Sequence, residues 1–491
     1  MKLKELTSKY YLYVTVFITG AVILILEILG TRIIAPYYGT TIYVWSSLIS
    51  VTLVALALGY FLGGWLADKK PESNILYLII LFAALAILLI PLITNFVLIK
   101  TNVLGARFGA LMSATILFTI PLILLGMIAP YAIKLKTKGL EKVGITAGSL
   151  YGIATVGSFA GAILTGFYLI PNFGINAIIY LISSLLILIT CISFVIHKRI
   201  LALATAVLVL VFIIVPKPII GEQNQGEVKV IYETQSAYAK LKVIDELGLY
   251  RYLFVNGATH TWYQLERKEF ILPYLRLFEK AITYHSNPKD ILVIGLGGGG
   301  IDKTLENYNL AIDNIEIDPK IAEIARKYFN FNGKVIIDDG RHYIRNTNKK
   351  YDIVFLDVYS DYSIYPYLFS KEAFEEIKNI LNNDGILVIN TIVYEDDLLS
   401  TNDKAILSIH KTLKEIFPHV FVQSPGRGLT NFVFYASDAE LSPDKEFYSI
   451  NVPAGGIILT DNYNPIESFI IKTSERLRIF NIERFGNEVL I

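Results

Sequence analysis

The chain has 491 residues, of which 54% are hydrophobic and only 18% are charged, and its formal net charge is +1. Soluble globular domains carry about 25% charged residues, so this composition excludes an entirely soluble chain. The balanced charge gives no indication of a nucleic-acid partner. The single cysteine, Cys191, excludes an internal disulfide framework and a cysteine-based zinc site.

Apolar runs in the first 220 residues are long enough to cross a bilayer, which requires about 20 consecutive residues in helical form. The pattern predicts a multi-pass α-helical membrane domain over residues 1–220, with six or seven spans. The expected spans are Tyr11–Ile34, Tyr43–Leu66, Ile75–Val97, Leu111–Leu135, Ala147–Ile170, Ala177–Ile196 and Ile200–Ile214, the last being the shortest.

Small residues recur four positions apart within these runs. On a helix such pairs lie on one face and allow two backbones to approach closely, so we interpret them as helix-packing seams. A channel lined by the same glycines is the alternative. The three pairs are Gly59 with Gly63, Gly148 with Gly152, and Gly157 with Gly161.

One carboxylate, Glu27, lies inside the first span, where a charge is costly unless it is paired or protonated. It indicates either a functional site within the membrane or a structural pair with Arg32 or a neighbouring helix. We favour the structural pair.

Lysine and arginine in the short loops indicate that the N-terminus is cytoplasmic. Basic residues cluster before the first span and after the second, fourth and sixth. Seven full spans would place the C-terminal half outside the cell, where nucleoside cofactors are scarce. The alternatives to a seventh crossing are that this short run lies in the interface or re-enters the membrane. We expect a multi-pass cell-membrane protein whose catalytic domain is cytoplasmic.

The second half has the alternating pattern of an α/β protein. Residues 221–264 predict a small antiparallel β subdomain with a turn at Glu246–Gly248. Residues 265–491 predict a Rossmann-like doubly wound sheet that binds its ligand at the carboxyl ends of the strands. The expected parallel strands are Ile291–Ile294, Asn314–Ile317, Lys334–Ile337, Ile353–Leu356 and Gly385–Asn390.

Glycines and acidic residues follow successive expected strands. Gly295, Gly297 and Gly299 form a G-x-G-x-G turn after the first strand, where a ligand must contact the backbone. Glu316 ends the next strand, about 20 residues on, at the place of a carboxylate that binds ribose hydroxyls. Asp338 and Asp339 follow the third strand, near an expected adenine, and Asp357 follows the fourth and faces the reaction centre. For each acid alone, the alternative is a helix cap or a solvated loop residue.

These landmarks predict a ligand with one ribose and an adenine. The glycines at 295, 297 and 300 also satisfy the dinucleotide pattern G-x-G-x-x-G. However, the Asp339–Gly340 pair and Asp357 are not part of that pattern. They suit a nucleoside that carries a reactive sulfonium, which is S-adenosylmethionine or its decarboxylated form.

The stretches "EIDPKIAEIARKYF" and "LFSKEAF" with "LNNDGILV" resemble spermidine synthase, the polyamine aminopropyltransferase, over roughly Val228–Asn390. The whole chain resembles the membrane-fused spermidine synthase-like proteins in "LEILGTRIIAPYYG", "LALGYFLGGWLAD" and "LTDNYNPIE". The resemblance implies a class I methyltransferase-like fold that transfers an aminopropyl group from decarboxylated S-adenosylmethionine to a small amine or polyamine.

The same resemblance implies roles for individual residues. Asp357 would be the catalytic proton acceptor, Glu316 would hold the ribose, and Asp339 with Gly340 would hold the adenine edge. The expected substrate-side residues are Asp361, His260 and Tyr238. We expect no metal, and the scattered histidines have no metal-ligand spacing.

The sequence also departs from the family pattern. Gly298 replaces the aspartate that holds the ammonium end of the aminopropyl group, and His260 replaces a glutamine. Ala239 stands where the family has another glutamine, and Leu272 and Pro273 replace a tyrosine and a polar residue. The nucleoside half of the site is therefore better preserved than the amine half.

Three functions remain open from the sequence. The first is a membrane-anchored aminopropyltransferase, and the second is a methyltransferase that uses ordinary S-adenosylmethionine. The third is a transporter whose soluble domain senses a polyamine or nucleoside, to which Glu27 and "GYFLGGWLADKK" would contribute. The expected partners are an amine substrate and the lipid bilayer, and a homodimer is the expected assembly.

Overall fold

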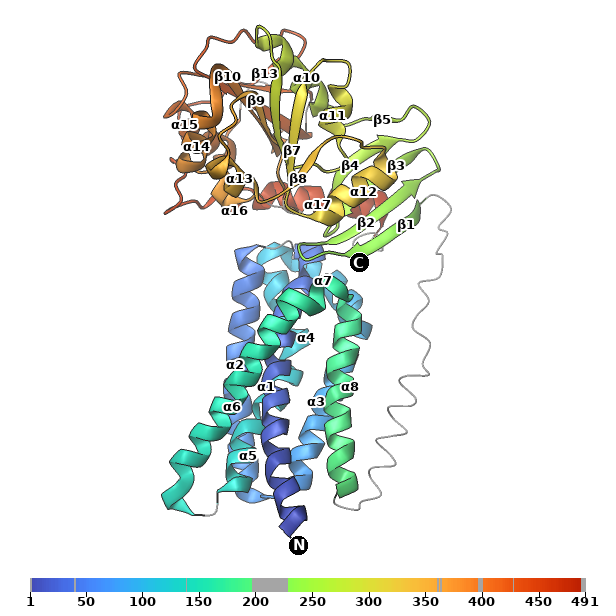
Figure 1. Cartoon of the computed structure of the whole chain (residues 1–491), viewed down its shortest axis with the longest axis vertical. Helices are drawn as coiled ribbons and strands as arrows, with labels where there is room; N and C mark the ends of the chain where they lie inside the picture. Colours follow the sequence, from blue (N-terminus) through green and yellow to red (C-terminus); the bar gives the residue numbers. More distant parts are fainter. Residues whose placement is uncertain are drawn as a thin grey trace. The chain divides into compact units, whose positions relative to one another are not determined.

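A computed structural model of the whole chain describes residues 2–38, 41–137, 139–196, 228–359, 362, 364–395, 401–426 and 428–486. The chain divides into two compact units. The first contains the helices that precede residue 197, and the second contains the strands and helices that follow residue 227 (Figure 1). The predicted seventh span, Ile200–Ile214, lies outside the described residues.

The first unit is a bundle of long apolar helices. Six helical segments among the described residues are long and apolar enough to cross a membrane, in agreement with the first six predicted spans. The helices are α1 (Lys2–Tyr38), α2 (Ile42–Lys69), α3 (Ser73–Thr101), α4 (Gly105–Gly126), α5 (Ile128–Lys136), α6 (Val143–Leu164), α7 (Ile170–Asn172) and α8 (Ile175–Ile196).

The predicted span Leu111–Leu135 is interrupted at Met127, between α4 and α5. Pro130 explains the interruption, because a proline has no N–H to donate to the carbonyl four residues earlier, at Gly126. Gly59 and Gly63 of α2 pack against this junction. A Cβ on Gly63 would lie 2.4 Å from the Met127 carbonyl oxygen. The predicted seam at these two glycines is confirmed.

A second seam joins α6 to α1. A Cβ on Gly157 would lie 2.0 Å from the Phe17 carbonyl oxygen, and one on Gly161 would also meet the α1 backbone. In contrast, Gly148 and Gly152 have open space where a side chain would be, so the predicted seam at that pair is wrong. The pattern of small residues four apart is the same at all three pairs, and only the neighbouring helix distinguishes them.

Large apolar side chains cover the outer surface of the helical unit. Phe61 is 73% exposed, Phe108 70% and Phe167 83%. A protein surrounded by water rarely exposes so much contiguous apolar surface, whereas lipid tails would cover it. Glu27 lies within α1 and is half-buried.

The second unit contains two sheets. The small sheet has the order β1-β2-β3-β4-β5 and is antiparallel from β2 to β5. It extends through Phe270, beyond the expected limit at residue 264. Its strands are β1 (Val228–Gln235), β2 (Lys240–Glu246), β3 (Tyr250–Val255), β4 (Ala258–Gln264) and β5 (Glu269–Phe270).

The large sheet has the order β13-β11-β12-β10-β9-β6-β7-β8. The five strands from β10 to β8 are parallel to their neighbours, and β12 is antiparallel to β10 and β11. The predicted Rossmann-like, methyltransferase-like fold is confirmed. The strands are β6 (Asp290–Ile294), β7 (Ala311–Glu316), β8 (Val335–Ile337), β9 (Tyr351–Leu356), β10 (Leu381–Glu395), β11 (His419–Ser424), β12 (Gly428–Ser437) and β13 (Tyr448–Ser449).

Helices cover both faces of the large sheet, as its alternating side chains require. The helices are α10 (Tyr274–Tyr284), α11 (Gly300–Thr304), α12 (Pro319–Phe329), α13 (Gly340–Asn346), α14 (Lys371–Ile380), α15 (Lys404–Lys414), α16 (Ile466–Phe469) and α17 (Ile471–Phe485) (Figure 1). On β6, Leu292 and Ile294 join a core with α13, α14 and α15, whereas Ile291 and Val293 join a core with α10 and α11. The small sheet packs on α12.

Candidate active site

The strand order reverses beside β6, which has β7 on one side and β9 on the other. Doubly wound sheets bind ligands at such a point, outside the carboxyl ends of the strands. Ile294, the last residue of β6, pairs with Ile315 of β7 and with Leu356 of β9. The residues that follow these three are Gly295, Glu316 and Asp357, so the register brings them together at one edge of the sheet.

The glycine turn leaves β6 in a conformation that favours glycine. Gly295, Gly297 and Gly299 all have positive φ, at 94°, 53° and 86°. A Cβ on Gly295 would lie 2.2 Å from the Asp357 carbonyl oxygen, so any larger residue would separate the ends of β6 and β9.

Glu316 joins β7 to this glycine turn. One carboxylate oxygen accepts a hydrogen bond from the Leu296 N–H at 3.1 Å, and the other accepts from the Asp318 N–H at 2.9 Å. The side chain is only 7% exposed. Burial raises the pKa of Glu316 to about 7, although the two backbone donors act in the opposite direction. Each oxygen keeps a second lone pair for a ligand hydroxyl.

The binding of a nucleoside should depend on pH through Glu316. The pKa of about 7 in the folded protein lies above the ordinary value of 4.5. The protonated carboxyl therefore contributes its full share to the free energy of unfolding below pH 4.5, and this contribution is lost as the pH rises through about 7. Ligand binding has the opposite dependence if the ionised carboxylate holds the ribose. We expect nucleoside affinity to fall by about tenfold per pH unit well below pH 7. Titration calorimetry from pH 5 to 8 measures this slope.

Glu316→Gln is the matched variant, because the amide keeps the shape but does not titrate. Its affinity should be low and almost independent of pH in this range. A slope that persists in the variant would assign the proton to another group.

Asp339 follows β8 at the same edge of the sheet, which we call the nucleoside crevice, and it caps α13. One carboxylate oxygen accepts from the His342 N–H and the other accepts from the Tyr367 hydroxyl, both at 2.9 Å. Gly340 allows α13 to approach β6, because a Cβ there would lie 2.5 Å from Ile294. Asp318 likewise caps α12. The helix-cap alternative therefore describes both aspartates, and Asp339 keeps free lone pairs beside the crevice.

Asp357 follows β9 and is held on both oxygens. Tyr274 donates its hydroxyl hydrogen to one oxygen at 2.8 Å, and Asn390 donates an amide hydrogen to the other at 2.9 Å. Asn431 in turn donates to Asn390 at 2.9 Å. Burial raises the pKa of Asp357, while the bonds from Asn390 and Tyr274 lower it. The result is a carboxylate with a fixed orientation and an increased affinity for a proton.

Two of the three predicted substrate-side residues lie beside the crevice. The Tyr238 side chain is partly exposed, and its partial burial together with the nearby carboxylates of Asp318, Asp339 and Glu316 raises its pKa. His260 lies on β4, and its carbonyl oxygen would be 3.8 Å from a Cβ on Gly297. Both residues therefore lie beside the crevice. Asp361 lies outside the described residues.

Residues of β4 and β5 surround Gly298, the position at which the family that the sequence resembles has an aspartate. Thr261 accepts the Gly298 N–H on its hydroxyl oxygen at 2.9 Å. A Cβ on Gly298 would lie 2.6 Å from the Thr261 methyl carbon and 3.0 Å from the Phe270 ring. The neighbouring side chains therefore leave no room for a side chain at Gly298.

Sequence reasoning missed Tyr274, Thr261 and Asn431 as parts of this site. Tyr367 belongs to the tyrosine-rich stretch "DVYSDYSIYPYLF", which the sequence indicates as a lid over the substrate or as an aromatic packing loop. Asn390 had a signal, since it is a polar residue at the end of the apolar strand run "GILVIN". The other three have no local signal, because each lies on a separate element of the fold.

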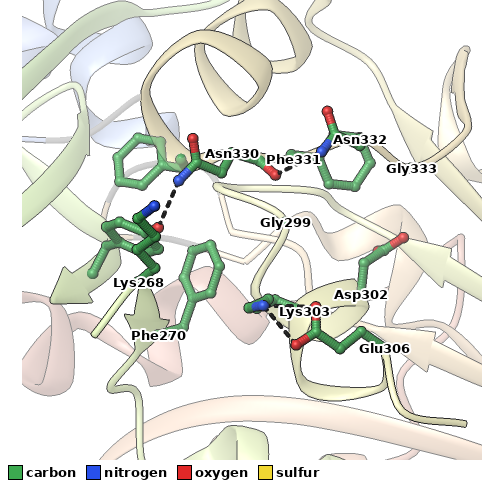
Figure 2. Close-up of a pocket in the computed structure, with 12 residues that line it drawn as sticks. Lys268, Phe270, Gly299, Asp302, Lys303, Glu306, Asn330, Phe331, Asn332 and Gly333 are labelled. Atoms are coloured by element: carbon green, nitrogen blue, oxygen red, sulfur yellow. Dashed lines mark hydrogen bonds and ion pairs between the residues drawn. The ribbon is translucent and has the colours of Figure 1, made fainter. Parts of the chain in front are cut away.

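A cavity of about 400 Å³ lies behind the glycine turn, between the β4–β5 turn, α11 and the loop after α12 (Figure 2). Gly299 lines it together with Phe270, Asp302 and Phe331. None of Glu316, Asp339 and Asp357 lines this cavity. The acidic edge, and not this cavity, therefore has the chemistry expected of the reaction centre. No group of three or more potential metal ligands is present among the described residues.

The sheet topology, the glycine turn and the carboxylates at the strand ends define a Rossmann-like, doubly wound domain, a class that binds ligands at this edge of the sheet. Residues 276–425 match the family model of the spermine/spermidine synthase domain.

The chain is 31% identical to the polyamine aminopropyltransferase of Vibrio vulnificus over 180 residues, which cover 34% of this chain and 60% of the relative. It is also 31% identical to the polyamine aminopropyltransferase of Methanocaldococcus jannaschii over 169 residues, covering 32% of this chain and 56% of the relative. The chain thus spans less than two thirds of the length of these relatives. The spermidine synthase of Thermotoga maritima aligns with a TM-score of 0.37 and 22% identity, covering 50% of this chain and 83% of that structure.

Proposed function

We propose that the protein is a membrane-anchored aminopropyltransferase that uses decarboxylated S-adenosylmethionine and a primary amine. The observation that carries this proposal is the Asp357 carboxylate, fixed by Tyr274 and Asn390 next to the nucleoside-facing Glu316. The polyamine aminopropyltransferases among the relatives support the same reaction.

The residues present fit the nucleoside part of this donor. Glu316 offers two lone pairs at the place of the ribose hydroxyls, and Asp339 offers lone pairs at the place of the adenine amino group. The exposed rings of Tyr238 and Tyr367 and the exposed Ile337 side chain provide apolar surface near these acids. A flat base would cover part of that surface.

When bound, the donor supplies a sulfonium-linked methylene carbon, which forms a C–N bond to the amine while its C–S electron pair returns to sulfur and leaves methylthioadenosine. Asp357 takes the proton that the ammonium must lose before its lone pair can attack. General-base catalysis of this kind contributes about 10²–10⁴-fold. Fixed orientation of the two reactants contributes about 7–11 kcal/mol.

Gly298 favours a second candidate, methyl transfer from ordinary S-adenosylmethionine. The Thr261 methyl group and the Phe270 ring fill the space that an aspartate at position 298 would need. Without that carboxylate, the ammonium of an aminopropyl group has no acidic partner from the glycine turn, and a buried unpaired ammonium is strongly disfavoured. An acidic side chain from another element that reached this ammonium would remove the argument for methyl transfer.

Product analysis distinguishes the two reactions. The purified full-length protein is incubated with each donor and a mixture of primary amines, and the nucleoside products are separated by chromatography. Aminopropyl transfer gives methylthioadenosine, and methyl transfer gives S-adenosylhomocysteine. We expect methylthioadenosine, and S-adenosylhomocysteine as the sole amine-dependent product would reject the proposal.

We also propose that the helical unit spans the cell membrane and that the catalytic unit is cytoplasmic. Six crossings return the chain to the side of its N-terminus, which the basic loops indicate to be the cytoplasm. Accessibility of single cysteines in a Cys191→Ala background tests this, with Glu72→Cys as the expected inside position and Asn102→Cys as the expected outside position. A tag at the C-terminus should be labelled with the inside position. The homodimer remains a prediction.

A further inference from the structure

The stretch "LTDNYNPIE" at Leu459–Glu467 is far from the glycine turn in the sequence, yet it contacts the segment that borders the nucleoside crevice. Asn464 donates its amide hydrogen to the Pro366 carbonyl oxygen at 2.8 Å. The Leu459 carbonyl oxygen accepts from the Lys371 N–H at 2.7 Å. These bonds hold the turn at Pro366–Leu368 from outside the crevice.

Asp461 makes the strongest contact of this stretch, a bidentate ion pair with Arg341. The two guanidinium nitrogens donate to the two carboxylate oxygens at 2.6 and 2.7 Å. Ser370 adds a hydroxyl bond to Asp461 at 2.6 Å. Hydrogen bonds from Arg341 lower the pKa of Asp461, so the carboxylate is ionised near neutral pH. Paired planar groups of this kind fix geometry as well as charge.

Arg341 connects Asp461 to the residues that line the crevice. Its side chain is buried, and it also donates to the Tyr367 carbonyl oxygen at 2.7 Å and to Glu376 of α14 at 2.9 Å. Tyr367 then donates its hydroxyl hydrogen to Asp339 at 2.9 Å. Arg341 therefore lies two residues from Asp339 in the chain and also holds the backbone of the tyrosine that orients the Asp339 carboxylate.

We infer that Asp461 and Arg341 are positioning residues for the adenine edge of the nucleoside, which they fix through Tyr367 and Asp339. The inference rests on the proposed function, since it takes Asp339 as the acceptor of the adenine amino hydrogen. It assigns a task to the C-terminal stretch, which contributes no side chain to the carboxylates of the crevice among the described contacts.

The test uses the full-length protein in detergent and two probes without an amino-acid tail, methylthioadenosine and methylthioinosine. These probes avoid the question raised by Gly298 and differ at the base carbon that carries the adenine amino group. Titration calorimetry gives the affinity of each for the wild type, for Asp461→Asn and for the control Asp438→Asn. Asp438 forms an ion pair of 2.6 Å with Lys378, which lies on α14 like Glu376.

We expect Asp461→Asn to bind methylthioadenosine about 10-fold more weakly and methylthioinosine less than about 3-fold more weakly, so that the preference for adenine is reduced. Asp438→Asn should change neither affinity. Arg341→Lys, which keeps the charge but cannot form the bidentate pair, is the second variant if Asp461→Asn does not fold.

Each other result overturns the inference. Equal loss for both probes would mean that Asp461 only supports the fold, and unchanged affinities would mean that the pair has no influence on the crevice. In either case a wild type that prefers methylthioadenosine would leave the proposed function intact. A wild type that binds neither probe would reject the proposed function and this inference together.

Discussion

Replacing Asp357 with Asn should lower turnover by about 10²–10⁴-fold while the affinity for the nucleoside changes by no more than a few-fold. The variant keeps the shape of the side chain. The new amide oxygen can still accept from Asn390, and the Tyr274 hydroxyl can turn and accept from the new amide nitrogen, which preserves the contacts at 2.9 and 2.8 Å. Only the ability to take a proton is lost. Initial rates and calorimetric titration of the same preparation measure the two effects.

Tyr274→Phe separates a catalytic base from a structural residue. The hydroxyl of Tyr274 lowers the pKa of Asp357, so its removal should raise that pKa and shift the acid limb of the kcat/KM profile to higher pH. Turnover at the optimum should change much less than in Asp357→Asn. If Asp357→Asn loses nucleoside affinity and turnover in parallel, Asp357 supports the crevice and does not act as the base.

The sequence was sufficient to predict the edge of the sheet on which these residues lie. Runs such as "ILVI" and "IVFL" identify buried parallel strands because both faces of such a strand are covered. Once β6, β7 and β9 are recognised, chain topology alone brings the residues after Ile294, Ile315 and Leu356 together. The lengths of the strands were harder to predict from the sequence. We expected a strand at Gly385–Asn390, whereas β10 covers Leu381–Glu395. Its C-terminal part is longer because the pairing with β12 continues as far as Glu395.

The partners of the acidic residues were not predictable in this way. Tyr274 reaches Asp357 across 83 residues of sequence, and Arg341 reaches Asp461 across 120. No local periodicity connects such positions, because each pair is set by how α10 or the C-terminal stretch packs on the sheet. The glycine pairs of the helical unit illustrate the same limit, since Gly148 and Gly157 have equivalent spacing partners but only Gly157 contacts another helix.

The substitution Gly298→Asp should destabilise the protein, and adding Thr261→Ser should recover much of the loss. Gly298 does not have a left-handed backbone, so an aspartate is not excluded by conformation. It is excluded by crowding, because its Cβ would lie 2.6 Å from the methyl carbon of a buried threonine. Overpacking of this kind costs about 1–3 kcal/mol. Serine removes that methyl carbon and keeps the oxygen that accepts the Gly298 N–H at 2.9 Å. Thermal unfolding of both variants measures the recovery.

The double variant Thr261→Ser with Gly298→Asp also tests which donor the glycine turn selects. A carboxylate at position 298 would pair with the ammonium of decarboxylated S-adenosylmethionine and would lie near the negative carboxylate of ordinary S-adenosylmethionine. Because both donors carry the ammonium, the difference comes from the carboxylate of ordinary S-adenosylmethionine. Placing two like charges in contact costs several kcal/mol, so the affinity ratio of the two donors should shift by at least about tenfold toward the decarboxylated form. Thr261→Ser alone is the control and should leave the ratio unchanged. If the double variant is stable but the ratio does not move, the ammonium is held by another acid, and Gly298 is then no argument for methyl transfer.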